Sequence, residues 1–271
     1  MKQKNHGKRV LVTGGSGQLG QELDLVMSNY DVQHWCLDIS EMDITCESKV
    51  REVLRGLEPS IVIHAAAYTS VDKCEKDQAK AMAVNTDATG RLARFCGYLG
   101  IPLVYISTDF VFDGEKGCPY GIDDATKPLN VYGTTKLKGE QQVKMAGEDH
   151  WIIRTSWLYS TYGGNFPKAI LRMAASGTAP RVVNDQVGSP TYARDLAKAV
   201  CKLAGVIPNE VAGPYGVYHF SNRGACSWWE FAREILVLSG WLEHEPRLAP
   251  EPITSLELAR PAVRPAYSVL S

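Results

Sequence analysis

The stretch that decides the fold is Arg9-Val10-Leu11-Val12-Thr13-Gly14-Gly15-Ser16-Gly17-Gln18-Leu19-Gly20. A short β-branched run breaks into a glycine-rich turn, and apolar residues then recur at helical spacing up to Met27, which predicts strand, turn and helix. The glycines can be read as Gly15-x-Gly17-x-x-Gly20 or as Gly14-x-x-Gly17-x-x-Gly20. Glycines let the backbone approach a pyrophosphate, and the free N–H groups of the helix start favour its charge. We therefore expect this turn to bind a dinucleotide cofactor, through Gly14, Gly17, Gln18, Leu19 and Gly20.

Two further turns extend the expected cofactor site. The strand 32–37 ends at Asp38, about where the Rossmann pattern places a carboxylate that accepts both hydroxyls of the adenosine ribose. Such an acid tends to repel a 2′-phosphate and so favours NADH, although the sequence leaves NADPH open. Asp43 and Ile44 follow in the next turn, before a helix over 47–57 for which Thr45 is the expected cap. Ala65-Ala66-Ala67 continues the buried strand 61–64 with side chains small enough for a nicotinamide ribose to lie against the backbone.

Strands and helices alternate along the first half of the chain, with short turns marked by Gly or Pro. This order predicts an α/β fold, a Rossmann-type doubly wound parallel sheet covered on both faces. A helix over 78–99 carries Asn85, and the strand 103–106 ends in Ser107-Thr108-Asp109. Ligands bind at the carboxyl ends of such strands, so these side chains are candidates to meet a substrate, although they could simply cap the turn. His64, inside an apolar strand, is interpreted as a structural histidine.

Tyr132 and Lys136 lie four residues apart in a segment that reads as helical, so they share one face. An unperturbed Tyr titrates near pKa 10, and a neighbouring positive charge favours its phenolate. The pair could therefore deliver a proton near neutral pH. The spacing alone is equally typical of an amphipathic helix with a packed Tyr and a solvated Lys.

Taken in order, these motifs resemble the extended short-chain dehydrogenase/reductase superfamily. The longer strings resemble the dTDP-4-dehydrorhamnose reductase family in particular, over nearly the whole chain; they lie at residues 13–20, 107–114, 132–140, 154–159 and 185–191. The resemblance implies reduction of the C4 ketone of a nucleotide-linked 4-keto-6-deoxy sugar, dTDP-4-dehydro-L-rhamnose, by NADPH or NADH. It implies Tyr132 as proton donor, Lys136 as partner of the phenol and the nicotinamide ribose, and Thr108 as hydrogen-bond donor to the ketone. The substrate contacts expected on the same grounds are Thr108, Asp109, Trp157, Asn165 and Arg264.

The sequence departs from the family at three places. Some members gather glutamates around Mg²⁺, and Glu22 matches one of those positions, but Arg194 stands where another acid is expected, so we expect no metal site. The family's string Arg-Pro-Ala-Asn-Ser near the C-terminus appears here as Arg264-Pro265-Ala266-Tyr267-Ser268, with Tyr267 in place of the asparagine. Compared with the family, the sequence stops at Ser271 before a final helix, which would affect lobe stability and nucleotide affinity more than hydride transfer.

The resemblance and the patterning predict two parts. Residues 1–155 form the dinucleotide-binding Rossmann domain, to which a helix at about 192–204 returns, and 156–271 form mostly a substrate-binding lobe. In that lobe we expect a helix over 166–175 and one capped by Ser227. Trp228, Phe231, Ile235 and Leu238 on the latter are its expected core, and an irregular tail runs over 243–265.

The composition bounds the class of protein. The 271 residues are 45% hydrophobic with formal net charge −1, which offers no electrostatic argument for nucleic acid or an anionic membrane. The polar, basic residues 1–8 precede an apolar run too short for a signal peptide, and seven cysteines without a C-x-x-C pair fit a reducing cytoplasm. We expect a cytoplasmic protein that takes a small-molecule substrate, crosses no membrane, binds no nucleic acid and could form a homodimer.

Three other activities share these motifs. A reductase of a different 4-keto-6-deoxy sugar stays open as the alternative, because the glycine turn and the Tyr/Lys pair say nothing about sugar stereochemistry. A non-catalytic NADP-binding subunit, like the regulatory subunit of methionine adenosyltransferase, fits less well because Thr108, Tyr132 and Lys136 are all present. A nucleotide-sugar dehydratase is disfavoured, since Phe110 follows Asp109 where those enzymes carry a second acid.

Overall fold

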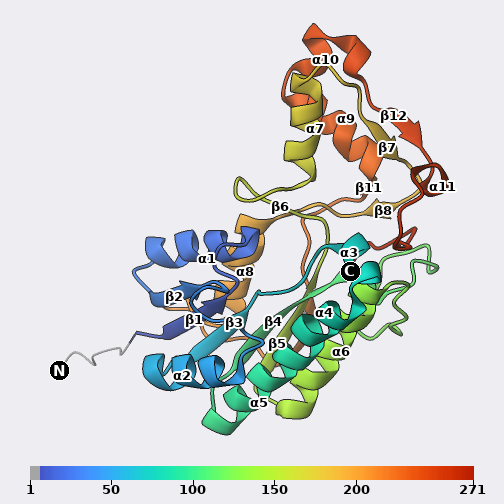
Figure 1. Cartoon of the computed structure of the whole chain (residues 1–271). Coiled ribbons are helices and arrows are strands. Elements are labelled where there is room, and N and C mark those ends of the chain that lie inside the picture. Colours follow the sequence, from blue (N-terminus) through green and yellow to red (C-terminus); the bar gives the residue numbers. More distant parts are fainter. Residues whose placement is uncertain (1–6) are drawn as a thin grey trace.

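The structure, a computed structural model, describes residues 7–271 (Figure 1). Residues 1–6 of the basic N-terminal segment lie outside this range. Its centre is a six-stranded sheet in the order β10-β5-β4-β3-β1-β2, in which every neighbouring pair is parallel. The strands are β1 (Arg9–Thr13), β2 (Gln33–Leu37), β3 (Ile61–His64), β4 (Leu103–Thr108), β5 (His150–Thr155) and β10 (Gly216–His219). The predicted fold class is therefore confirmed.

Alternating strand residues bury opposite faces of the sheet. Val10 and Val12 of β1 pack under α1 (Gln18–Asn29) and α8 (Ala193–Leu203), whereas Leu11 faces the opposite layer. That second layer holds α2 (Glu47–Leu57), α5 (Thr89–Leu99) and α6 (Val131–Ala146). Strands buried on both faces explain the continuous apolar runs of the sequence.

The helix expected over 78–99 is continuous but not uniform. It consists of α4 (Gln78–Met82), a π-helical segment η1 (Ala83–Ala88) and α5, preceded by the short α3 (Val71–Lys76). The π turn carries Asn85, and such turns are frequent at functional sites. The cap expected at Thr45 was wrong, because α2 begins after Cys46.

A smaller group of elements stands apart from the sheet, above it in Figure 1. Its members are α7 (Phe166–Ala175), β7 (Arg181–Val183), α9 (Trp228–Leu238), α10 (Trp241–His244), η3 (Pro246–Leu248), β12 (Glu251–Ile253) and α11 (Ser255–Leu258). Two short strand pairs lie between it and the sheet: β6 (Leu158–Tyr159) pairs with β9 (Thr191–Tyr192), and β8 (Val187–Gly188) pairs with β11 (Cys226–Ser227). Ile170, Ala232 and Leu236 are buried in its own core.

Several expectations for the second half need correction. Leu238 is 79% exposed, and Leu236, two residues earlier on α9, takes the core position. The tail is not irregular, because β12 pairs with β7 and Thr254 caps α11 in a capping box with Glu257. Strand β10 adds a sixth strand to the sheet from within the stretch expected to be mostly lobe. Ser227 caps α9 as predicted.

No helix within residues 7–271 has the length and apolar character needed to span a membrane.

Candidate active site

A cavity of about 650 Å³ opens at the carboxyl ends of the parallel strands, beneath the separate group of helices. Most of the side chains expected at the cofactor and substrate sites line it. They are Gly14, Gly17, Gln18, Leu19, Gly20, Asp38, Asp43, Ile44, Ala65, Ala66, Ala67, Thr108, Asp109, Tyr132, Lys136 and Trp157. Residues from distant parts of the chain meet here because parallel strands all end at the same edge of the sheet.

The glycine turn packs backbone against backbone. A Cβ on Gly15 would lie 2.3 Å from the Cys36 carbonyl oxygen, and one on Gly20 would lie 2.3 Å from that of Gly14. Gly14 itself has φ +76°, a conformation that favours glycine. Helix α1 starts after Gly17 without a side-chain cap. Its first N–H groups therefore remain available to an anion such as a pyrophosphate.

Asp38 lies beside this turn at the end of β2. The Ser16 hydroxyl donates to its carboxylate at 2.5 Å, and the Gly15 N–H donates to the Leu37 carbonyl at 2.9 Å. The loop and the acid are thus held together, as an adenosine ribose site requires. Ser16 was not predicted, although its position within the glycine turn was a sufficient signal.

His64 is a satisfied structural histidine. Its Nδ1 lies 2.7 Å from the Thr13 hydroxyl and its Nε2 lies 3.0 Å from that of Thr89. Burial, together with the charge of Lys136, lowers the pKa of His64 to about 3, so the ring is neutral near pH 7. The Thr13 hydroxyl also accepts from the Ala66 N–H at 3.3 Å, which fixes the alanine segment over the sheet.

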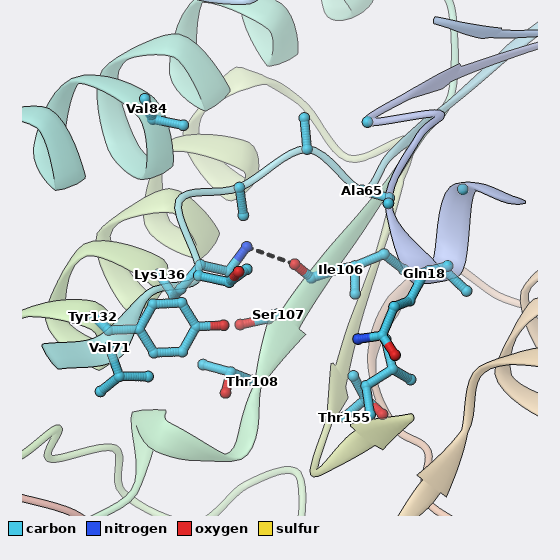
Figure 2. A pocket seen from close by; sticks show the side chains of 18 of the residues that line it. Gln18, Ala65, Val71, Val84, Ile106, Ser107, Thr108, Tyr132, Lys136 and Thr155 are labelled. Atoms are coloured by element: carbon cyan, nitrogen blue, oxygen red, sulfur yellow. Dashed lines mark hydrogen bonds between the residues drawn. The ribbon is translucent and has the colours of Figure 1, made fainter. Parts of the chain in front are cut away.

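Helix α6 brings Tyr132 and Lys136 to the end of β4. Asn130 caps it by accepting from the Gly133 N–H at 2.8 Å. Gly133 is required by the close approach, since a Cβ there would lie 2.1 Å from the Phe110 carbonyl oxygen. Figure 2 shows the Tyr132 hydroxyl pointing toward the Ser107 and Thr108 side chains.

Lys136 is held by the strand rather than by the phenol. Its Nζ donates to the Ile106 carbonyl at 2.6 Å (Figure 2) and lies 4.1 Å from the centroid of the Tyr105 ring. Burial lowers the pKa of Lys136 to about 7. Burial also raises the pKa of Tyr132, the charge of Asp109 adds to the rise, and the Thr108 hydroxyl opposes it. Contrary to the expectation from the sequence, Lys136 therefore does not bring the pKa of the phenol below its ordinary value.

Thr108 caps the turn after β4, and both Thr108 and Asp109 line the cavity. The Thr108 hydroxyl accepts from the Phe110 N–H at 3.2 Å and donates to Asp109 Oδ1 at 3.0 Å. Within residues 7–271, Asp109 Oδ2 is buried without a hydrogen-bond partner. Burial raises the pKa of Asp109 to about 6. The capping interpretation and the substrate-site interpretation are compatible, because Thr108 caps the turn and both residues also line the cavity.

Three residues that were expected at the cofactor and substrate sites, Asn85, Asn165 and Arg264, do not line this cavity. Asn85 holds the backbone of Tyr68 on both sides, accepting from its N–H at 2.8 Å and donating to its carbonyl at 3.1 Å. Asn165 caps α7 and donates to the Gln18 side chain at 3.0 Å. Both therefore support the walls of the site from behind, and sequence spacing alone could not distinguish this role from direct contact.

Arg264 lines a second cavity of about 380 Å³, which shares Phe110, Trp157 and Trp228 with the first. Arg181, Gln186 and Arg260 also line it. Between the two cavities, the indoles of Trp157 and Trp228 stack with centroids 3.5 Å apart and planes 9° apart. Trp228 was predicted as lobe core, and the structure places it at the site as well.

Thr155, at the end of β5, is a further lining residue that the sequence analysis missed. Its Oγ1 is buried, without a partner in the described part of the chain, and Figure 2 shows it opposite Tyr132 across the cavity, near Gln18. Its place at the carboxyl end of a strand, like that of Thr108, was the available signal.

Glu22 and Arg194 are paired. Arg194 Nε lies 2.8 Å from Glu22 Oε2, and the Ser160 hydroxyl donates to Oε1 at 2.6 Å. The Glu22 carboxylate is thus held by a guanidinium and a hydroxyl.

The model of one protein family, described as "RmlD substrate binding domain", matches residues 8–271. The chain is 43% identical over 265 residues to the spore coat polysaccharide biosynthesis protein SpsK of Bacillus subtilis, covering 97% of this chain and 89% of that protein. It is 39% identical over 263 residues to a dTDP-4-dehydrorhamnose reductase of Sinorhizobium fredii, covering 97% and 88%.

Among solved structures, a dTDP-4-dehydrorhamnose reductase of Bacillus anthracis in complex with NADP superposes with a TM-score of 0.89 at 37% identity, covering 98% of this chain and 90% of that one. The family match and the relatives agree with the family that the sequence motifs resemble. By its sequence over residues 8–271 and by its fold, the chain belongs to the RmlD substrate binding domain family.

Proposed function

We propose that this protein reduces the C4 ketone of dTDP-4-dehydro-L-rhamnose to dTDP-L-rhamnose, with NADPH or NADH as cofactor. The observation that carries the proposal is the meeting of Thr108, Tyr132 and Lys136 at the end of β4, on the wall of a cavity that also contains the glycine turn. Relatives with the same fold and more than a third of their residues in common are named for this reaction.

The residues present fit a nicotinamide dinucleotide. The tightly packed glycine turn and the uncapped start of α1 suit a pyrophosphate. Asp38 suits the adenosine ribose, and Ala65-Ala66-Ala67 leave room along the backbone for the second ribose. The cofactor, when bound, supplies the hydride. Asp38 favours NADH, whereas the B. anthracis relative was solved with NADP, so both cofactors belong in the test.

The chain's own residues would supply the proton and orient the ketone. The Tyr132 hydroxyl would donate its proton to the oxygen on which negative charge develops. Thr108 would hydrogen-bond the same oxygen, and a donor aimed at a developing oxyanion is commonly worth about 3 kcal/mol. Lys136, charged and fixed on the Ile106 carbonyl, would stabilise the phenolate left behind. Because burial lowers the pKa of Lys136 to about 7, its charge near neutral pH depends on the groups around it.

We assign the nucleotide end of the substrate to the second cavity. Its three arginines, Arg181, Arg260 and Arg264, suit a diphosphate, and Trp157 and Trp228 offer stacking faces between the two cavities. Arg264 is already bonded to Asp72, so it would contact the diphosphate only through its remaining donors or after a change of partner. Asn165 and Asn85 would act as supports for the site walls.

We further propose a cytoplasmic location and no role in nucleic-acid binding, on the grounds of near-neutral charge and unpaired cysteines. A homodimer is proposed only from the family resemblance. We propose a division into a dinucleotide-binding part, 1–155 with 192–204, and a mostly substrate-binding part, 156–271, to which β10 is the exception.

The test is oxidation of NADH and of NADPH, followed at 340 nm, with dTDP-4-dehydro-L-rhamnose generated in the same tube by the upstream enzymes. Oxidation that depends on the keto sugar, with dTDP-L-rhamnose as the product, is expected. Turnover of a different 4-keto-6-deoxy sugar alone would change the substrate but not the chemistry. Cofactor binding without turnover of any keto sugar would overturn the proposal in favour of a regulatory subunit.

A further inference from the structure

Glu140 is a buried carboxylate on the same helix face as the proposed catalytic pair. Tyr132, Lys136 and Glu140 follow one another at intervals of four residues along α6, so their side chains form one row. The side chain of Glu140 is 1% exposed. None of the chemistry proposed above uses it, yet the burial of a charge needs a compensating partner.

Three hydrogen bonds hold this carboxylate. Arg154 of β5 donates from Nε to Oε1 at 3.0 Å and from an Nη to Oε2 at 2.8 Å, a two-point contact in which its own side chain is 4% exposed. The Ser107 hydroxyl of β4 donates to Oε1 at 2.6 Å. Ser107 lies between Ile106, which holds Lys136, and Thr108. The carboxylate therefore ties α6 to the two central strands directly behind the site.

Stability alone is a weak reason for such a pair. Replacing a buried ion pair by uncharged groups of similar volume is often neutral or stabilising, because desolvation of both ions is costly. The position of the pair suggests a second role. Its negative member lies on the helix that carries Lys136, one turn away, and its positive member lies on the neighbouring strand.

Among the groups around Lys136, Glu140 is the carboxylate that favours the positive charge of the lysine. Tyr105 presents the face of its ring, His64 is neutral, and the Ile106 carbonyl accepts a hydrogen bond. The remaining titratable neighbours of the row are Tyr132 on the same helix, Cys74 on α3, Asp109 at the end of β4, Arg154 on β5 and His219 on β10. Burial lowers the pKa of Lys136, and the charge of Glu140 is the influence that opposes this fall.

We infer that Glu140, fixed by Arg154 and Ser107, is a positioning residue whose carboxylate keeps Lys136 protonated on the wall of the cavity. It touches neither the reacting atoms nor the cofactor site, and acts through Lys136. The inference rests on the proposed function for its catalytic meaning. Its physical content is the charge state of one lysine, which can be measured without substrate or cofactor.

The experiment is an NMR titration of the cofactor-free protein labelled with ¹³C at the lysine Cε, whose chemical shift follows deprotonation of Nζ. The Lys136→Met variant, which lacks the resonance, assigns it. The deciding variant is Glu140→Gln with Arg154→Met, in which both buried charges are removed together and the volume is kept, so that no unpaired buried ion is left to unfold the protein. Glu140→Asp, which keeps the charge, is the matched conservative control.

In the double variant we expect the midpoint of the Lys136 titration to fall, while the midpoint in Glu140→Asp stays closer to that of the wild type. An unchanged midpoint in a folded double variant, judged by circular dichroism and its thermal midpoint, would overturn the inference and leave the pair a purely structural role. If the wild-type protein does not reduce the keto sugar, the proposed function is rejected, but the Lys136 titration still tests the role of Glu140.

Discussion

Arg264 forms a two-point ion pair with Asp72, with Nη–Oδ distances of 3.1 and 3.0 Å. Asp72 lies on α3 beside the sheet, and Arg264 lies on the C-terminal segment that lines the second cavity. Burial of Asp72 works against its charge, but the hydrogen bonds and charge of Arg264 win and keep the pKa of the carboxyl below its ordinary value. One contact thus connects two parts of the molecule that are 192 residues apart in the chain.

This contact predicts a measurable coupling between the two side chains. Asp72→Asn, Arg264→Gln and the double variant, compared by urea unfolding, should give a coupling free energy of roughly 1–2 kcal/mol, because a partly buried charged pair with two hydrogen bonds exceeds an exposed one. If the changes in the free energy of unfolding of the two single variants add up to that of the double variant within about 0.3 kcal/mol, the pair is too weak to hold the C-terminal segment.

Tyr132→Phe removes the proposed proton donor while keeping the ring. The variant should lower kcat at least about 100-fold, roughly 2.7 kcal/mol, with little change in the Kd for NADPH measured by fluorescence. Tyr98→Phe is the matched control, because Tyr98 is 85% exposed on α5 and outside the cavity. Turnover near that of the wild type in Tyr132→Phe would remove this residue as the donor.

Asp38 sets the cofactor preference in our interpretation. Asp38→Ala should raise the ratio of kcat/KM with NADPH to kcat/KM with NADH about tenfold or more, since a carboxylate next to a 2′-phosphate is unfavourable. Ser16→Ala serves as the control that removes the hydrogen bond to Asp38 but leaves its charge. If this ratio changes equally in both variants, the effect comes from the conformation of the glycine turn and not from the charge of Asp38.

The glycine turn predicts a sharp difference between two substitutions of the same kind. Gly15→Ala places a Cβ 2.3 Å from a backbone oxygen and should destabilise the protein by about 1–3 kcal/mol and weaken cofactor binding. Gly56→Ala, near the end of α2, meets no atom within 4 Å and should stabilise the protein by up to about 1 kcal/mol. Thermal midpoints and NADPH titrations of the two variants make the comparison.

His64 predicts a pH dependence of stability. Its folded pKa of about 3 lies below its unfolded value near 6.5, so only the unfolded state gains the proton in that window. The free energy of unfolding should therefore fall as the pH falls from 6.5 toward 3, by up to about 1.4 kcal/mol per pH unit from this residue. His64→Gln should flatten this slope in urea titrations, and the exposed His244→Gln should not. Equal slopes in all three proteins would contradict the neutral buried ring.

Local sequence was enough to predict the Rossmann sheet and most of the residues that line the cavity at its strand ends. The glycine turn after β1, the acid at the end of β2 and the Ser107-Thr108-Asp109 turn after β4 all lie at strand ends, and parallel strands bring their carboxyl ends to one edge. The helix over 47–57 and the cap at Ser227 were also predictable from local sequence, because the spacing of apolar residues and a capping hydroxyl act within one or two helical turns.

Only the tertiary structure decided which polar residues contact the cavity and which support it. Asn85, Asn165 and Arg264 find partners 17, 147 and 192 residues away, so no local pattern could separate support from contact. The same holds for the return of β10 to the sheet and for Leu236 in place of Leu238, which depend on packing against distant elements. Sequence spacing placed Tyr132 and Lys136 on one face of a helix, but burial between α6 and β4, and the carboxylate of Glu140 behind them, determine the charge that Lys136 carries.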